Sequence, residues 1–199
     1  MKILLIGASG TIGQAVARNL GARHQVITAG RSSGDHRVDL TQDASVAALL
    51  ETVGRVDAII STAGNLHFGP IGEMSAEQFN LGLQDKLLGQ VRLALLGQRT
   101  LNDGGSITLT AGVLAIEPIR NGANATAVNA ALEAFASAAA IELPRGIRIN
   151  VISPTLLTES LDAYAPYFPG FETVSAERAA LAYQRSVEGA QTGRTYRVM

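Results

Sequence analysis

Short apolar runs of strand length alternate with helix-patterned segments along this chain. Lys2–Ile6, Gln25–Ala29 and Val56–Ser61 are such runs, and Val56–Ser61 has almost no polar interruption, which is typical of a strand buried on both faces. Between these runs, apolar residues recur at the three- and four-residue spacing of a helix, as at Val46, Leu49, Leu50 and Val53. Strands separated by helices favour right-handed βαβ units and a parallel sheet.

The rest of the chain continues this alternation. Further strands are predicted at 37–40, 106–110, 147–152 and 194–198, with a turn at 102–105. Ser75 and Gln78 form a capping-box pattern that opens a helical stretch reaching about Leu101. Gly82 and Gly89 interrupt it, so we expect two helices or one bent helix. An alanine-rich helix follows over 124–143, and Ser175 opens another. The prediction is an α/β fold with one doubly wound, Rossmann-type parallel sheet of about seven strands and helices on both faces.

Composition limits the class of protein. The 199 residues fit a single domain, and 47% hydrophobic with 17% charged residues exclude a disordered chain. A net charge of −1 does not indicate a nucleic-acid or membrane partner. The absence of cysteine excludes disulfides and thiolate catalysis, and the three histidines lack zinc-binding spacing, so no metal site is predicted. No run is long enough for a spanning helix or signal peptide, so we expect a cytoplasmic domain.

The segment 155–173 is the one long irregular stretch. It concentrates aromatic and proline residues, namely Tyr164, Pro166, Tyr167, Phe168, Pro169 and Phe171. A long loop in a compact domain usually has a function. We therefore expect 155–173 to cover a small-molecule substrate.

A glycine-rich loop follows the first predicted strand and opens the first helix. In Gly7-Ala-Ser-Gly10-Thr-Ile-Gly13, the first glycine permits a tight turn, the second lets backbone N–H groups approach a pyrophosphate, and the third lets the helix pack on the sheet. The helix N-terminus adds a favourable dipole. The alternative is a tight turn without a ligand. The predicted cofactor-binding residues of this loop are Gly7, Ser9, Gly10, Thr11, Ile12 and Gly13.

Arg31 and Ser32 follow the second strand, about twenty residues past this loop. An acidic residue here would bind the ribose 2′-hydroxyl of NAD, whereas an arginine offers donors to the 2′-phosphate of NADP. The sequence therefore predicts a preference for NADP(H) over NAD(H), unless Arg31 is only a solvated surface residue. Asp39 and Leu40 are placed beside the adenine.

In the order and spacing of its motifs, the chain resembles the short-chain dehydrogenase/reductase family over nearly its whole length. The matching motifs are Gly7–Gly13, Asp39-Leu40, Ser61-Thr-Ala-Gly64, Gly105–Gly112, Asn129-Ala-Ala-Leu132 and Arg148–Pro154. The resemblance implies one NAD(P)-binding domain over 1–199. It also implies cofactor contacts from Ser61, Thr62, Ala63, Gly64 and Pro154, and a homo-oligomer, either dimer or tetramer.

The catalytic positions depart from that family. Typical members carry a tyrosine and a lysine four residues apart, with a serine thirteen residues before the tyrosine. Aligned on this chain, the serine, tyrosine and lysine positions are Gly112, Ala125 and Asn129, and the family's assisting asparagine is replaced by Lys86. Loss of general acid–base help costs typically about 10² to 10⁴ in rate.

Three residues are predicted to compensate for this loss. As a desolvated amine, Lys86 would donate a proton, Thr110 would orient a substrate oxygen, and Asn129 would bind the cofactor ribose. Each residue also has a purely structural interpretation: Lys86 as a surface residue, Thr110 as a strand residue and Asn129 as a helix residue. His67, Glu117 and Arg120 are weaker candidates, for which a loop or surface role is favoured.

The sequence thus favours an NADP(H)-dependent oxidoreductase that transfers hydride to or from a small carbonyl or alcohol through an atypical site. Two alternatives stay open. The chain could be a non-catalytic dinucleotide sensor, or it could perform non-redox chemistry on the same scaffold, because fold does not determine function.

Overall fold

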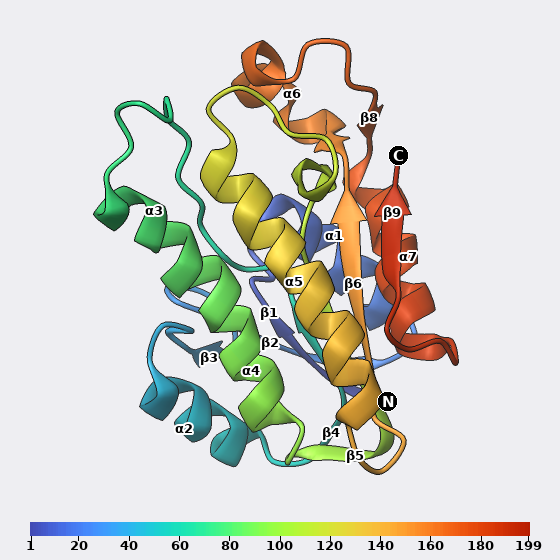
Figure 1. Ribbon diagram of the computed structural model, residues 1–199. Helices are drawn as coiled ribbons and strands as arrows, with labels where there is room; N and C mark the ends of the chain where they lie inside the picture. The colour runs from blue at the N-terminus through green and yellow to red at the C-terminus, as the bar shows by residue number, and fades with distance from the viewer.

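Seven parallel strands form one sheet in the computed structural model, which describes residues 1–199 (Figure 1). Their order across the sheet is β3-β2-β1-β4-β5-β6-β9, and each neighbouring pair is parallel. The strands are β1 (Lys2–Ile6), β2 (Gln25–Gly30), β3 (His36–Arg37), β4 (Val56–Ser61), β5 (Leu101–Thr110), β6 (Arg148–Pro154) and β9 (Thr195–Val198). The predicted doubly wound α/β sheet is confirmed.

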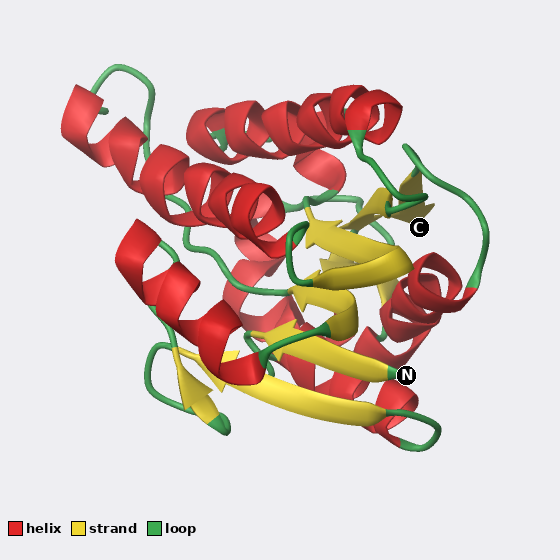
Figure 2. Ribbon diagram, turned by 90° about the horizontal axis from the view of Figure 1, so that it is seen from below, coloured by secondary structure: helices red, strands yellow, loops and turns green.

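Helices cover both faces of this sheet (Figure 2). They are α1 (Thr11–Gly21), α2 (Asp43–Val53), α3 (Ala76–Gly82), α4 (Gly89–Gly97), α5 (Ala123–Glu142) and α7 (Ala176–Glu188). Helices α1 and α7 pack on one face, whereas α2, α4 and α5 pack on the other. None of the helices is both long and apolar enough to cross a bilayer.

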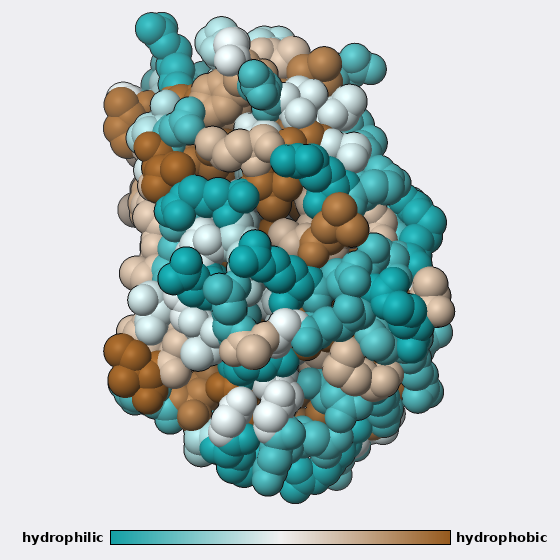
Figure 3. All heavy atoms as spheres, turned by 90° about the vertical axis from the view of Figure 1, so that its right-hand side faces the viewer, coloured by the Kyte–Doolittle hydropathy of each residue, from teal (hydrophilic) through white to brown (hydrophobic).

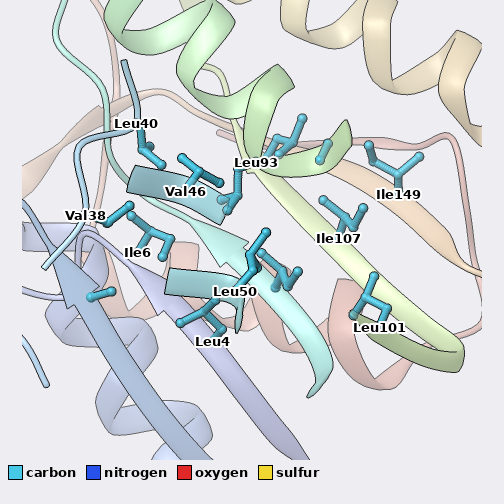
Figure 4. Close-up of a cluster of buried hydrophobic side chains, with 14 of the residues drawn as sticks. Leu4, Ile6, Val38, Leu40, Val46, Leu50, Leu93, Leu101, Ile107 and Ile149 are labelled. Carbon is cyan, nitrogen blue, oxygen red and sulfur yellow. The ribbon is translucent and has the colours of Figure 1, made fainter. Parts of the chain in front are cut away.

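The larger hydrophobic core lies between the sheet and α2, α4 and α5 (Figure 4). Leu4 and Ile107 on the strands pack there with Leu50 and Leu93 on the helices, and all four are almost fully buried. Full burial of a side chain of this size stabilises the fold by about 1.5–3 kcal/mol. A second core, which includes the fully buried Tyr183, fills the opposite face.

The helical stretch after Ser75 is one continuous bent unit. The Ser75 Oγ accepts a hydrogen bond from the Gln78 backbone N, and the Gln78 Oε1 accepts one from the Ser75 N, so the capping box is confirmed. Between α3 and α4 the chain adopts a π-helix, η1 (Leu83–Leu88). The stretch ends at Gly97, earlier than expected. π-Helical turns inside α-helices occur frequently at functional sites.

Two local predictions were wrong. The third strand, expected at 37–40, consists of only His36–Arg37. The turn expected at 102–105 lies inside β5, where Leu101 pairs with Val56 and Ser106 pairs with Ala58. The extra residues bulge out of the ladder without ending the strand, and Gly104 adopts a positive φ of 72°, which glycine tolerates best.

The 155–173 segment contains short elements, although it was expected to be irregular. β7 (Leu156–Leu157) pairs with β8 (Thr173–Val174), and the chain between them forms η3 (Thr158–Ser160), α6 (Leu161–Tyr164) and η4 (Ala165–Tyr167). Figure 1 places this segment beyond the carboxyl ends of the strands. On the side drawn in Figure 3, several apolar groups lie at the upper end of the molecule, where α6 is located.

Candidate functional site

The glycine loop lies where the order of the strands reverses, between β1 and β4. Gly7 has a φ of +87°, and a Cβ there would come within 2.9 Å of the Thr62 Oγ1. A Cβ on Gly13 would overlap the carbonyl oxygen of Gly7. Both glycines are therefore required by the packing of the loop itself, whether or not a ligand binds.

Gly10 is different, because nothing in the protein fills the space beside it. A Cβ there would meet only the Gly7 O, at an ordinary 3.6 Å. Gly10 is also the N-cap of α1, and it has no side chain to satisfy the first N–H groups of the helix. Ser9 and Thr11 are exposed on either side of it. The loop thus leaves an open approach to free backbone donors, which fits a pyrophosphate.

Arg31 follows β2 and is already paired. Its Nη2 lies 3.2 Å from the Asp85 Oδ2 and 3.6 Å from the Asp39 Oδ1, and 59% of its side chain is exposed. Hydrogen bonds from Thr41 and the charge of Arg31 lower the pKa of Asp39, so its carboxylate is charged at neutral pH. Ser32 beside Arg31 is exposed. Sequence reasoning missed Asp85, because it comes from a distant helical turn.

The motif Ser61–Gly64, which begins at the last residue of β4, packs against the glycine loop. Ser61 is fully buried, and its Oγ has no hydrogen-bond partner in the protein. The Thr62 hydroxyl lies within hydrogen-bond distance of two backbone acceptors, the Ile6 O (3.0 Å) and the Gly7 O (3.1 Å). This contact holds the end of β4 against the glycine loop. Leu40, expected beside the adenine, is also a buried core residue.

A cavity of about 350 Å³ opens beside the loop, at the carboxyl ends of β5 and β6. Its lining includes no carboxylate and is largely apolar. The lining residues include Ile12, Lys86, Gly112, Leu114, Asn129, Pro154, Tyr164 and Phe168. Tyr164 and Phe168 come from the 155–173 segment. Sequence reasoning marked this segment by its aromatic content but did not single out these two side chains.

Lys86 is buried in the wall of this cavity. It belongs to the π-helix, and its residue is only 8% exposed. Its Nζ donates to the Ala111 O at 3.1 Å, and it forms no ion pair. Burial lowers the pKa of Lys86 from 10.5 to about 8. An amine with this pKa is positively charged at neutral pH but gives up its proton readily.

Gly64 positions the stem of Lys86. Gly64 has a φ of +137°, and a Cβ on it would lie 2.6 Å from the Cγ of Lys86 and 2.8 Å from its Cα. The lysine side chain therefore occupies the space that any larger residue at 64 would need. Both residues line the cavity.

Asn129 faces the same cavity from α5. It is only 2% exposed, and its buried Oδ1 has no hydrogen-bond partner in the protein. Buried polar atoms are nearly always paired, so an unpaired acceptor in a cavity wall is suited to a ligand hydroxyl. Gly112 lies next to it, where a Cβ would be 3.2 Å from the Asn129 Nδ2.

Thr110 does not join these residues. Its Oγ1 lies 2.5 Å from the Ser61 O and 2.6 Å from the Tyr183 hydroxyl of α7, on the opposite face of the sheet. Its backbone N and O are bound by the side chain of Gln90, which is fully buried. The structure therefore assigns Thr110 a role in packing, and no sequence signal indicated the part of Gln90.

The weaker candidates also lie outside the cavity lining. The His67 backbone N donates to the Asn124 Oδ1 at 3.0 Å, while its ring is not part of the cavity wall. Glu117 and Arg120 are exposed. Arg120 lines a separate, shallow apolar hollow with Ile119.

Comparisons with known proteins agree on one family. The sequence model described as enoyl-(acyl carrier protein) reductase matches residues 7–197. The crystal structure of a protein from Listeria innocua is 51% identical, with a TM-score of 0.99 and full coverage of both chains. The crystal structure of a small-chain dehydrogenase in complex with NADPH is 30% identical, with a TM-score of 0.88, covering 100% of this chain and 96% of that one.

Curated relatives are more distant. An uncharacterized oxidoreductase of Mycobacterium tuberculosis is 29% identical over 188 residues, which cover 80% of this chain and 68% of the relative. An uncharacterized NAD-dependent oxidoreductase of the same organism is 28% identical over 158 residues, covering 75% of this chain and 58% of the relative. The chain thus matches only part of the length of these relatives.

Proposed function

Because this chain belongs to the short-chain dehydrogenase/reductase family, we propose that it is an NADP(H)-dependent oxidoreductase that acts on a small carbonyl or alcohol substrate through an atypical site. The observation that carries this proposal is the cavity beside the glycine loop. There an unpaired acceptor, Asn129, and a buried amine, Lys86, meet in a largely apolar wall.

The residues present fit a nicotinamide dinucleotide. Gly10 leaves room for backbone donors to reach a pyrophosphate, and the Asn129 Oδ1 can accept a hydrogen bond from a ribose hydroxyl. Ile12 and Pro154 offer apolar surface for the nicotinamide ring. When bound, the dinucleotide supplies or accepts a hydride.

Arg31 supports the choice of NADP(H). Its exposed pairs with Asp39 and Asp85 contribute only about 0–1 kcal/mol. A charge-assisted hydrogen bond to a phosphate contributes about 1.5–3 kcal/mol. A 2′-phosphate can therefore displace one of the carboxylates from the guanidinium, whereas NAD(H) offers no group that would do so. One relative was solved with NADPH and another is named NAD-dependent, so the residue itself has to be tested.

Lys86 replaces the phenol of the family's catalytic tyrosine as the proton donor. As a carbonyl is reduced, its oxygen gains negative charge, and an ammonium in a poorly solvated wall stabilises that charge. The Nζ then gives its proton to the oxygen. A pKa of about 8 suits this transfer, because acid–base catalysts work best near the operating pH.

The test is titration of NADPH and NADH into the protein, followed by nicotinamide fluorescence. Arg31→Ala is expected to weaken NADPH binding by about 10- to 100-fold, from the loss of 1.5–3 kcal/mol, and to leave NADH binding unchanged. Arg99→Ala is the matched control. Arg99 lies between α4 and β5, at the amino ends of the strands, whereas Arg31 follows the carboxyl end of β2. Equal effects on both dinucleotides, or no binding of either, would refute the proposal.

A second candidate function is a dinucleotide sensor without catalysis. Gly112, Ala125 and Asn129 carry no ionisable group, and Ala125 is fully buried against Val113 and Leu114. No tyrosine fits at Ala125 without repacking this cluster. Tight NADPH binding with no oxidation or reduction across a broad panel of aldehydes, ketones and alcohols would favour the sensor.

We also propose that the chain forms a homo-oligomer through α3, α4 and α5. Leu81, Leu88 and Leu95 recur every seven residues on the outside of the bent helix, and all three are exposed. Ile141 on α5 is 86% exposed. Light scattering after size-exclusion chromatography tests this: Leu95→Glu is expected to lower the mass to that of a monomer, and a monomeric parent would contradict it.

A further inference from the structure

The chain has only two lysines, and their surroundings differ. The Lys2 Nζ donates to the Val53 O at 2.6 Å near the amino edge of the sheet. The Lys86 Nζ makes one hydrogen bond, to the Ala111 O, inside the cavity. One of its three donor positions is thus occupied, and the others face no protein acceptor.

The cavity contains nothing that would hold Lys86 as a permanent cation. No aspartate or glutamate lines it, and the Asn129 Oδ1, which is not in hydrogen-bond contact with Lys86, is a neutral acceptor. Leu66, Phe68, Leu114 and Phe168 make most of the remaining wall apolar. Desolvation without a counter-charge disfavours the ammonium form and leaves more of the nucleophilic neutral amine.

The amine is also held in one place. The stem of Lys86 packs against Gly64, and the π-helix places the residue in the cavity wall, whereas Asp85 and Leu87 on either side of it are not part of that wall. A fixed nucleophile beside a bound carbonyl reacts faster than a mobile one, because the entropy of alignment is already lost.

We propose that Lys86 is a covalent carbonyl-binding site, whose amine condenses with a small uncharged aldehyde in this cavity. The neutral nitrogen attacks the carbonyl carbon to form a carbinolamine. Loss of one water then forms the carbon–nitrogen double bond of a Schiff base. The step is reversible, needs no dinucleotide and no oxidant, and goes beyond the proposed hydride transfer.

The cavity indicates the class of aldehyde. Its volume of about 350 Å³ lies at the lower end of the range for small-molecule sites. Lys86 is its only charged residue, so an anionic tail would find no second cation. A short aliphatic aldehyde fits both the volume and the apolar wall.

The test is reductive trapping with butanal and sodium cyanoborohydride at pH 7, without dinucleotide, followed by peptide mapping. The reagent converts the Schiff base into a stable N-butyl amine. From pKa values of about 8 and 10.5, the neutral fraction of Lys86 exceeds that of an ordinary lysine by on the order of 10²-fold. We expect Lys86 to be butylated at least about tenfold faster than Lys2.

Three controls make the result decisive. The N-terminal amine is the internal positive control, because Met1 is exposed and its amine is accessible to the reagent. Lys86→Met is expected to lose only the adduct at its own peptide. A dextran polyaldehyde, whose polymer chain is far larger than the cavity of about 350 Å³, is expected to label the N-terminus but not Lys86 in the parent protein, so this control needs no variant.

Butylation of the N-terminus and Lys2 without preference for Lys86 would overturn the proposal. So would equal labelling of Lys86 by the bulky aldehyde. Because the trapping uses no dinucleotide, it can succeed where the NADPH titration fails, and it can fail where the titration succeeds. The two proposals are therefore tested separately.

Discussion

Replacing Lys86 with methionine is expected to make the protein more stable at neutral pH. The side chain is buried in a cavity wall, makes one hydrogen bond and has no ion-pair partner. Folding therefore moves a cation out of water without a counter-charge, which is costly. Methionine has a similar length and fills the same space with apolar atoms.

The size of the effect follows from the pKa of Lys86. Its fall from 10.5 to about 8 corresponds to about 3 kcal/mol, at 1.36 kcal/mol for each pKa unit. Loss of the hydrogen bond to the Ala111 O subtracts about 1 kcal/mol. The free energy of unfolding at pH 7 is thus expected to rise by about 2 kcal/mol in the variant.

The gain must depend on pH in one direction. The folded state binds the lysine proton more weakly than the unfolded state, so protonation favours unfolding. The parent protein is destabilised fully below pH 8 and regains this stability as the pH rises from 8 toward 10.5. The advantage of the variant is therefore largest at pH 7 and about 2 kcal/mol smaller at pH 9.5.

Urea unfolding of both proteins at pH 7, 8.5 and 9.5, followed by far-UV circular dichroism, measures this difference. Lys2→Met is the matched control, because it reports the general effect of losing one positive charge. A variant that is less stable than the parent at pH 7 would refute the reasoning. So would an advantage that stays constant from pH 7 to 9.5.

Three further predictions concern the surroundings of the site. Gly13→Ala is expected to cost about 1–3 kcal/mol, because its methyl overlaps the loop backbone, whereas Gly10→Ala changes the unfolding free energy by less than about 0.5 kcal/mol but weakens NADPH binding. Similar melting temperatures for the two variants would contradict this. Tyr183→Phe is expected to cost about 1–3 kcal/mol in urea unfolding by leaving the Thr110 hydroxyl without this partner, and to leave NADPH affinity unchanged; a changed affinity would restore Thr110 to the site. Gly64→Ala is expected to slow butanal trapping at the buried lysine about tenfold or more, relative to the N-terminal amine, and an unchanged ratio would show that the glycine does not position it.

Much of the fold could be predicted from the sequence, because it depends on interactions between residues that are close in the chain. Continuous apolar runs such as Val56–Ser61 indicate strands covered on both faces, and the observed sheet is parallel throughout. The Ser75 cap was predictable because its partners are three residues away. Gly7 and Gly13 were identified for the same reason, since a tight turn between a strand and a helix requires them.

The candidate site needed the tertiary structure, because its contacts join distant segments. The sequence could mark Lys86 and Asn129 by alignment, but their burial and their shared cavity depend on how η1 and α5 pack. Thr110 shows the reverse case. Successive residues of a strand face opposite sides of the sheet. Only the packing of α7 decided that the Thr110 hydroxyl contacts Tyr183 and does not face the cavity.

The sequence by itself determined the parallel sheet and the glycine loop, since apolar period and turn chemistry act over a few residues. Only the tertiary structure decided which polar groups are desolvated. Burial depends on the sum of all neighbours, and it is burial without a counter-charge that lowers the pKa of Lys86.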